Sequence, residues 1–230
     1  RDRFGDEALQ RVRGFSLPEM HLPNHPDTLF ALVNALRDAG YRWLLVQEHS
    51  VEQLDGSPLN TAQRYLPNRL VARSTSGQEV SITALIKTQG SDTKLVGQMQ
   101  PCHEAIGLGR QRVDQMVVPS LVSQIADGEN GGVMMNEFPD AFLQAHRRLR
   151  DEAGSTVALN GTEYIEHLDA QGINWDALPS IQAVHQHRLW RRVGDSDDRE
   201  SMNTAISDLI NADDGFSMEG ASWTNNLSWV

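Results

Sequence analysis

The sequence has little cysteine, few aromatic residues and no long hydrophobic run. Cys102 is the single cysteine among 230 residues, so an internal disulfide is excluded and a thiolate metal site is not supported. Scarce cysteine is typical of a reducing compartment, and we expect a cytoplasmic protein. No apolar run approaches the roughly 20 residues that span a bilayer, so we expect no membrane partner.

The chain also lacks a surplus of basic residues. It has 20 Lys and Arg against 31 Asp and Glu, which gives a formal net charge of −11. An acidic chain repels phosphate backbones, so we expect no nucleic-acid partner. The densest basic cluster is Arg188, Arg191 and Arg192 around Trp190. We interpret it as a solvated helix face whose tryptophan is turned inward.

Apolar runs and helical periodicity alternate in the first part of the chain. Residues 12–17 and 43–47 are short apolar runs that indicate buried strands. Between them, apolar residues recur at helical spacing from Pro26, and Gly40 is a suitable helix end. This strand, helix, strand order favours a parallel sheet with crossover helices.

The remaining elements complete an α/β pattern. We expect a loop over 50–68, a hairpin around Ser76-Gly77, strands over 94–99 and 121–126, and helices over 138–150, 162–170 and 201–210. Strands become hard to find after Gly154, and we place a soft boundary near residue 160. We therefore expect part of a distorted parallel (β/α) barrel over 1–160, with a mostly helical C-terminal segment over 161–230.

Two carboxylates directly follow predicted strands. Glu19 comes after Leu17-Pro18, and Asp127 begins the stretch Asp-Gly-Glu-Asn. In β/α barrels the reacting groups lie at the C-terminal ends of strands. A glycosidase needs two carboxyl groups across the scissile bond, so two such acids on separate strands suit that chemistry. Spacing alone is a weak signal, since Asp127-Gly128 would also form an ordinary turn.

The residues around these acids resemble the motifs of glycoside hydrolase family 57. Gly-Phe-x-Leu-Pro-Glu, ending at Glu19, is similar to that family's nucleophile motif, an apolar strand that ends in Trp-Leu-Pro-Glu. The Asp-Gly-Glu-Asn stretch, 108 positions later (127 − 19), is similar to the motif that carries the general acid/base. Ser222-Trp223 resembles the start of the last motif, which lines the sugar site. Ser16 stands where the family has tryptophan.

This resemblance implies a retaining glycosidase or transglycosidase that acts on an α-glucan-like polysaccharide. Glu19 would be the nucleophile and Asp127 the general acid/base, and no cofactor or metal is implied. Candidate sugar contacts are Phe15, His21 and Trp223. The family's opening His-Gln-Pro motif is absent, so we expect it upstream of Arg1 and expect these 230 residues alone to be catalytically poor.

Two alternatives stay open. His21-x-x-x-His25 has the spacing of a metal-binding pair, as in the polysaccharide deacetylases of related barrels. Those enzymes carry an Asp pair ahead of the histidines, which is missing here, so we expect that His21 and His25 do not share a metal. The other alternative is a non-catalytic carbohydrate-binding relative, which the serine at position 16 permits.

Overall fold

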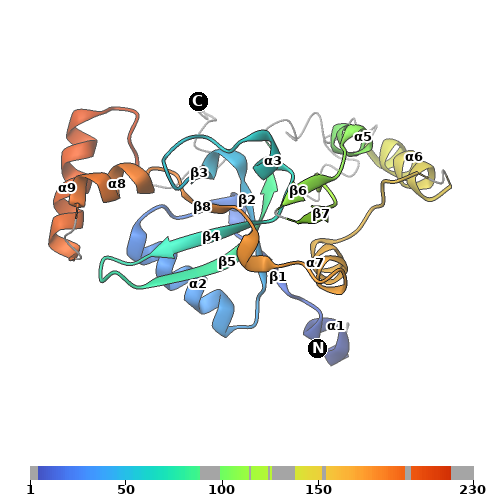
Figure 1. Cartoon of the computed structure of the whole chain (residues 1–230), viewed down its shortest axis with the longest axis horizontal. Coiled ribbons are helices and arrows are strands. Elements are labelled where there is room, and N and C mark those ends of the chain that lie inside the picture. The colour runs from blue at the N-terminus through green and yellow to red at the C-terminus, as the bar shows by residue number, and fades with distance from the viewer. Residues whose placement is uncertain are drawn as a thin grey trace.

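A six-stranded sheet forms the centre of the molecule (Figure 1). The structure is a computed structural model that describes residues 5–88, 99–113, 115–123, 125, 138–151, 154–194 and 198–218. The strand order is β1-β2-β5-β4-β8-β3. These strands are β1 (Gly14–Ser16), β2 (Trp43–Gln47), β3 (Val51–Gln53), β4 (Asn68–Arg73), β5 (Glu79–Lys87) and β8 (Ser180–Ala183). A separate antiparallel pair is made of β6 (Gln111–Val113) and β7 (Met116–Val118).

Helices and short 3-10 turns connect the strands. The α-helices are α1 (Gly5–Gln10), α2 (Pro26–Asp38), α3 (Thr61–Arg64), α5 (Gln100–Gly107), α6 (Phe138–Asp151), α7 (Gly161–Ala170), α8 (Gln186–Val193) and α9 (Arg199–Ala212). The 3-10 turns are η1 (Pro18–Met20), η2 (Glu48–Ser50) and η4 (Trp175–Ala177). None of the described helices is long and apolar enough to cross a membrane.

The sheet is mixed, with parallel pairs in the majority. Strands β1, β2 and β5 are parallel neighbours, β4 runs antiparallel to β5, β8 runs parallel to β4, and β3 runs antiparallel to β8. The structure thus confirms the expected α/β class and the parallel start of the sheet. Closure into a barrel stays a prediction.

The two faces of the sheet are covered by different elements. Helix α2 buries Leu29, Val33 and Leu36, at helical spacing, against Leu44 of β2 and Ile86 of β5. The alternate strand residues belong to a second core, where Leu45 and Leu85 meet Tyr164, Ile165 and Leu168 of α7. Successive strand residues point to opposite faces, so α2 and α7 lie on opposite sides of the sheet.

Trp43 fixes β1 and α7 to β2. A Cβ added to Gly14 of β1 would lie 1.9 Å from Cζ2 of this indole, and one added to Gly161 of α7 would lie 2.4 Å from it. The indole N–H donates a hydrogen bond to the hydroxyl of Thr162 at 3.2 Å. The close approach of three elements at one ring therefore requires glycine at both positions.

The C-terminal helices form a smaller core that is tied to the segment after η1. Leu189, Met202 and Phe216 pack together between α8 and α9. The side chain of Asn24 donates to the carbonyl of Ser217 at 2.9 Å, and the Gln186 amide donates to the carbonyl of Asn24. These bonds place residues 213–218 beside the chain that leads from Glu19 to α2.

Several elements confirm the expectations from the sequence, and others differ. The strand over 43–47, the hairpin and the helices that begin at Pro26 and Phe138 are present. Strand β3 and helix α3 lie within the expected loop, β8 lies within the segment expected to be helical, and the described residues 121–123 and 125 belong to no strand. Of the strand expected over 94–99, Met99 lies in a turn before α5 and the rest lies outside the described residues.

The strand expected over 121–126 is wrong for a physical reason. The Leu121 N–H donates to the carbonyl of Tyr65, and the Ser123 hydroxyl donates to the carbonyl of Ile86 at 2.8 Å. The segment therefore satisfies polar groups of the core through single bonds rather than through a ladder. A short apolar run alone does not distinguish these two cases.

Candidate active site

Glu19 follows the C-terminal end of β1, as predicted, and Glu48 directly follows the adjacent parallel strand β2, whereas the described residues 121–123 and 125 ahead of Asp127 do not form the expected strand. Turn η1, which contains Glu19, begins two residues after β1, and η2 begins at Glu48 directly after β2. The next parallel strand, β5, ends at the same level, because Lys87 is paired in register with Gln47. Strand β1 ends two residues earlier, at Ser16 beside Leu45, so with neighbouring strands about 4.8 Å apart and a rise of about 3.3 Å per residue the three strand ends lie within roughly 12 Å of one another.

The backbone at Glu19 is held in a tight turn. Pro18 begins η1, the Met20 N–H donates to the carbonyl of Leu17 at 2.8 Å, and the His21 N–H donates to the carbonyl of Pro18 at 3.1 Å. Met20 has a φ of 50° and a side chain that is 6% exposed. A left-handed conformation in such a residue costs roughly 1–3 kcal/mol and is found most often where function demands it.

Asp127, the other member of the predicted pair, follows the segment after β7 in the sequence. Asp127 and Trp223 lie outside the described residues, and the side chain of Glu19 does too. Ser123 is bonded to Ile86 near the end of β5, and Asp127 follows it by four residues. Four extended residues span at most about 14 Å, so the chain length allows Asp127 to reach the edge where Glu19 lies.

A charged pair lies at the end of β2. Oε1 of Glu48 is 2.8 Å from Nε of Arg64, the last residue of α3, and the side chains are 18% and 40% exposed respectively. Helix α3 reaches this edge because it precedes β4, which runs opposite to β5 and begins beside its C-terminal half. The preceding residue, Gln47, is 3% exposed, and its amide Nε2 has no hydrogen-bond partner in the described part of the chain.

A tyrosine and a second carboxylate adjoin this pair. The Tyr65 hydroxyl donates a short hydrogen bond to the carboxylate of Glu104 in α5. Burial, followed by the bond to Glu104, raises the pKa of Tyr65 to about 12, and the charge of Glu48 adds to the rise. The hydroxyl therefore stays protonated at neutral pH and acts as a donor. Four polar side chains, from η2, the last residue of α3, the residue after it and α5, thus gather near the end of β2.

The structure places two of the predicted sugar contacts. The ring of Phe15 packs edge-on against Tyr41 with centroids 5.2 Å apart and contacts the core under α2. This packing accounts for an aromatic residue there without a ligand. His21 is half-buried and directly follows η1, so it shares a turn with Glu19. As sugar contacts, both residues stay predictions.

The two histidines of the alternative metal site occupy different surroundings. His25 is the N-cap residue of α2, and burial lowers its pKa, although Asp27 opposes this shift. Its Nδ1 is buried and makes no hydrogen bond with the described part of the chain. Within the described ranges, no group of three His, Cys, Asp or Glu side chains is placed to hold a metal ion. The described structure therefore supplies no third ligand for this pair.

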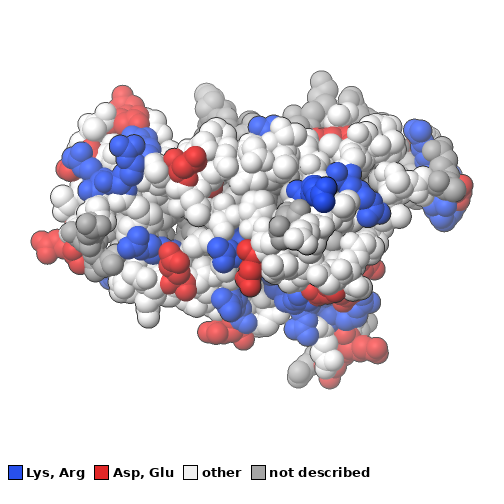
Figure 2. All heavy atoms as spheres, in the orientation of Figure 1, with Lys and Arg blue, Asp and Glu red and all other residues white. Residues whose placement is uncertain are grey.

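Two of the three arginines in the basic cluster of α8 are paired with neighbouring acids. Arg188 lies 2.8 Å from Asp213, and Arg192 lies 2.7 Å from Asp208. Trp190 is half-buried against the C-terminal core, as predicted, and the guanidinium of Arg73 lies over its ring at 4.4 Å. Figure 2 shows acidic and basic residues interspersed on the visible face. These contacts give no support for a phosphate site on α8.

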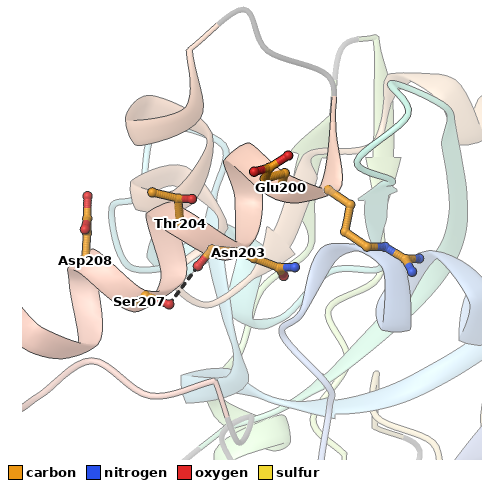
Figure 3. A pocket seen from close by; sticks show the side chains of 6 residues that line it. Glu200, Asn203, Thr204, Ser207 and Asp208 are labelled. Atoms are coloured by element: carbon orange, nitrogen blue, oxygen red, sulfur yellow. Dashed lines mark hydrogen bonds between the residues drawn. The ribbon is translucent and has the colours of Figure 1, made fainter.

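A shallow hollow along α9 has no catalytic arrangement. It is lined by residues of this one helix, and the Ser207 hydroxyl donates back to the carbonyl of Asn203 at 2.9 Å (Figure 3). Neither Glu19 nor the charged pair at the end of β2 lines it. The functional candidate is therefore the edge of the sheet and not this hollow.

Comparisons with known proteins identify no relative. No family model, no curated protein and no solved structure matches the chain. The motif resemblance and the geometry at the end of the parallel strands are therefore the grounds for a functional assignment.

Proposed function

We propose that this chain carries the catalytic carboxylates of a retaining glycosidase or transglycosidase that acts on an α-glucan-like polysaccharide. Glu19 attacks the anomeric carbon and forms a glycosyl-enzyme, while Asp127 protonates the leaving oxygen. Asp127 then takes a proton from water, or from a sugar hydroxyl in a transferase, as the glycosyl-enzyme bond breaks. The mechanism needs no cofactor.

The observation that carries this proposal is the position of Glu19. It stands in a constrained turn at the C-terminal edge of three parallel strands, the edge at which β/α enzymes place reacting groups. The strained, buried Met20 follows it directly. Residues in sparsely populated backbone conformations are concentrated at functional sites, which supports a functional role for this turn.

Chain lengths are compatible with the remaining assignments. Ser217 is bonded to Asn24, five residues after Glu19, and Trp223 follows Ser217 by six residues. Six extended residues span at most about 20 Å, so Trp223 is within reach of the Glu19 segment. Together with the chain-length limit on Asp127, this supports a single cleft shared by Glu19, Asp127 and Trp223. In a retaining enzyme the two carboxyl groups should stand about 5–5.5 Å apart across it.

The experiment that tests these roles uses azide as a replacement nucleophile. In a Glu19→Gly variant, azide enters the vacated space and attacks an activated donor such as α-glucosyl fluoride. The C–F bond breaks as the C–N bond forms, so the product has the opposite anomeric configuration to the donor. In Asp127→Gly, Glu19 still forms the glycosyl-enzyme, and azide attacks in the second step to give a product of retained configuration.

Without azide, we expect slow turnover by both variants. With azide, we expect each variant to form a glycosyl azide, and the two products should have opposite anomeric configurations. The conservative changes Glu19→Gln and Asp127→Asn should each lower turnover of an α-glucan at least about 10²-fold. A matched control is Glu79→Gln, at the opposite end of β5, which should keep normal activity. Normal turnover by Glu19→Gln would contradict the proposal.

A further inference from the structure

Two buried N–H donors near the end of β2 make no hydrogen bond with the described protein. One is Nε2 of Gln47, whose side chain is 3% exposed. The other is Nε of Arg64, which is 2.8 Å from Oε1 of Glu48 although its N–H is not directed at that oxygen. Nearly all buried donors in folded proteins are paired, because burial without a partner loses the hydrogen bonds that water would make. Two such donors around one carboxylate therefore require an explanation.

Their position connects them with the proposed catalytic edge. Gln47 is the last residue of β2, the strand between β1 and β5, and Glu48 begins the turn that follows. Arg64 ends α3, which leads into β4 at the same edge. Glu19 follows β1, the strand next to β2, and the two strands are about 5 Å apart. The unpaired donors thus lie one strand from the proposed nucleophile.

The charges at this place favour a neutral, hydroxyl-bearing ligand. The carboxylate of Glu48 lies 2.8 Å from the guanidinium of Arg64, so an anion bound at Arg64 would also face a negative charge. A sugar hydroxyl can accept from an N–H group and donate to a carboxylate at the same time. Hydrogen bonds of an active site are often long or poorly aligned in the free protein and tighten only in the complex, which is compatible with the unmade bonds of Gln47 and Arg64.

We propose that Gln47, Glu48 and Arg64 form a subsite that binds hydroxyl groups of the glucan, one strand from Glu19. Gln47 and Arg64 donate to sugar oxygens, and Glu48 accepts from a hydroxyl. The proposal rests on the proposed function and adds the residues that orient the substrate. A site built to hydrogen-bond a hydroxyl also discriminates against sugars that lack it.

The test separates a binding role from a structural one by measuring affinity and stability together. Gln47→Met nearly preserves the volume and removes the donor. If Gln47 serves the ligand, this change leaves the melting temperature of the free protein equal or higher, because an unpaired buried donor is lost. Binding of maltoheptaose to the inactive Glu19→Gln protein, measured by calorimetry, should weaken about 10-fold when Gln47→Met is added.

A matched control is another buried glutamine whose amide is paired. Gln182 of β8 donates to Glu52 at 3.0 Å, so Gln182→Met should lower the melting temperature and leave maltoheptaose affinity unchanged. Arg64→Gln, at a partly exposed side chain, provides a second measurement that does not depend on core packing. It should also weaken maltoheptaose binding about 10-fold.

Further outcomes distinguish a failure of the proposed subsite from a failure of the proposed function. Unchanged maltoheptaose affinity in both Gln47→Met and Arg64→Gln would overturn the subsite, even if the parent protein cleaves glucans. If the full-length protein that contains this chain cleaves no α-glucan and its Glu19→Gln variant binds no maltoheptaose, the proposed function itself is contradicted. A lower melting temperature for Gln47→Met with unchanged affinity would assign Gln47 to the fold.

Discussion

Asp27 joins three elements through one carboxylate. Its Oδ1 accepts hydrogen bonds from the Thr75 N–H at 2.8 Å and the Thr75 hydroxyl at 3.0 Å, and its Oδ2 lies 3.1 Å from Arg199. Burial by itself would raise the pKa of Asp27, but these bonds and the charge of Arg199 together lower it. The ionised form therefore holds the start of α2, the β4–β5 turn and the start of α9 together.

The pKa shift sets the sign of a pH effect on stability. The folded pKa of Asp27 is below the unfolded value of about 3.9, so its stabilisation is present above that pH and is lost as pH falls through the folded pKa. We expect Asp27→Asn to lower the melting temperature by about 2–6 °C at pH 7. The difference from the unaltered protein should shrink below about pH 4.

Thermal unfolding of both proteins between pH 3 and pH 7 tests this expectation. Asp140→Asn, at an exposed position of α6, controls for the loss of one negative charge. A difference between the unaltered protein and Asp27→Asn that stays constant over this pH range would show that the ionised carboxylate does not stabilise the fold.

At the scale of elements, a buried carboxylate holds the start of α8. Glu52 of β3 is 7% exposed and accepts hydrogen bonds from the His187 N–H at 2.8 Å, the His185 N–H at 3.1 Å and the Gln182 amide at 3.0 Å. Two of these donors are backbone groups at the N-terminus of α8, where a negative charge is favourable. Glu52 thus links β3, β8 and α8.

We expect Glu52→Gln to destabilise the protein by roughly 2–4 kcal/mol. The amide has one acceptor oxygen in place of two, and its NH₂ group faces N–H donors, so at least one buried donor loses its partner. Urea unfolding measures the change in the free energy of unfolding. Asp55→Asn, an exposed carboxylate in the turn after β3, should have a smaller effect. An equal effect of the two substitutions would refute the linking role of Glu52.

The longer strands could be predicted from the sequence, and the short strands β3 and β8 could not. Strands β2 and β5 have five and nine residues and β4 has six, which is enough to show an apolar run or an alternating pattern beside a recognisable turn. Strands β3 and β8, with three and four residues, exist because they pair with each other and β8 pairs with β4. Partners about 130 residues apart leave no local signal, so both strands were missed.

The candidate site was predictable only where a motif marked it. Glu19 was identified from its sequence context, and its place after β1 is confirmed. Gln47 was seen as the end of an apolar strand, and Arg64 fell in the expected loop. A polar residue that ends a buried strand was a usable signal for Gln47. The approach of Arg64 to Glu48 depends on the antiparallel direction of β4, which no local pattern indicated.

At the scale of the whole molecule, distant parts of the chain converge on one edge of the sheet. The C-terminal core is bonded to the segment after Glu19 through Asn24, and the segment after β7 is bonded to the end of β5 through Ser123. Helix α3 contributes Arg64, which contacts Glu48 at the end of β2. This convergence is what the proposed mechanism requires, because its two carboxylates must come from separate parts of the chain.

The proposed mechanism predicts a bell-shaped dependence of kcat/KM on pH. Glu19 must be ionised to attack and Asp127 must be protonated to assist the leaving group, so activity on an α-glucan should fall at both low and high pH. An activated donor such as α-glucosyl fluoride needs no proton on its leaving group. The alkaline limb should therefore be present for an α-glucan and absent from fluoride release, while the acid limb is present for both. In Asp127→Asn, cleavage of the α-glucan should be lost and the first step on the fluoride donor should survive; pre-steady-state release of fluoride, followed from pH 4 to pH 9, measures that step. If Asp127→Asn slowed fluoride release as strongly as glucan cleavage, or left glucan cleavage normal, the assignment of Asp127 as the acid would fail while that of Glu19 stood.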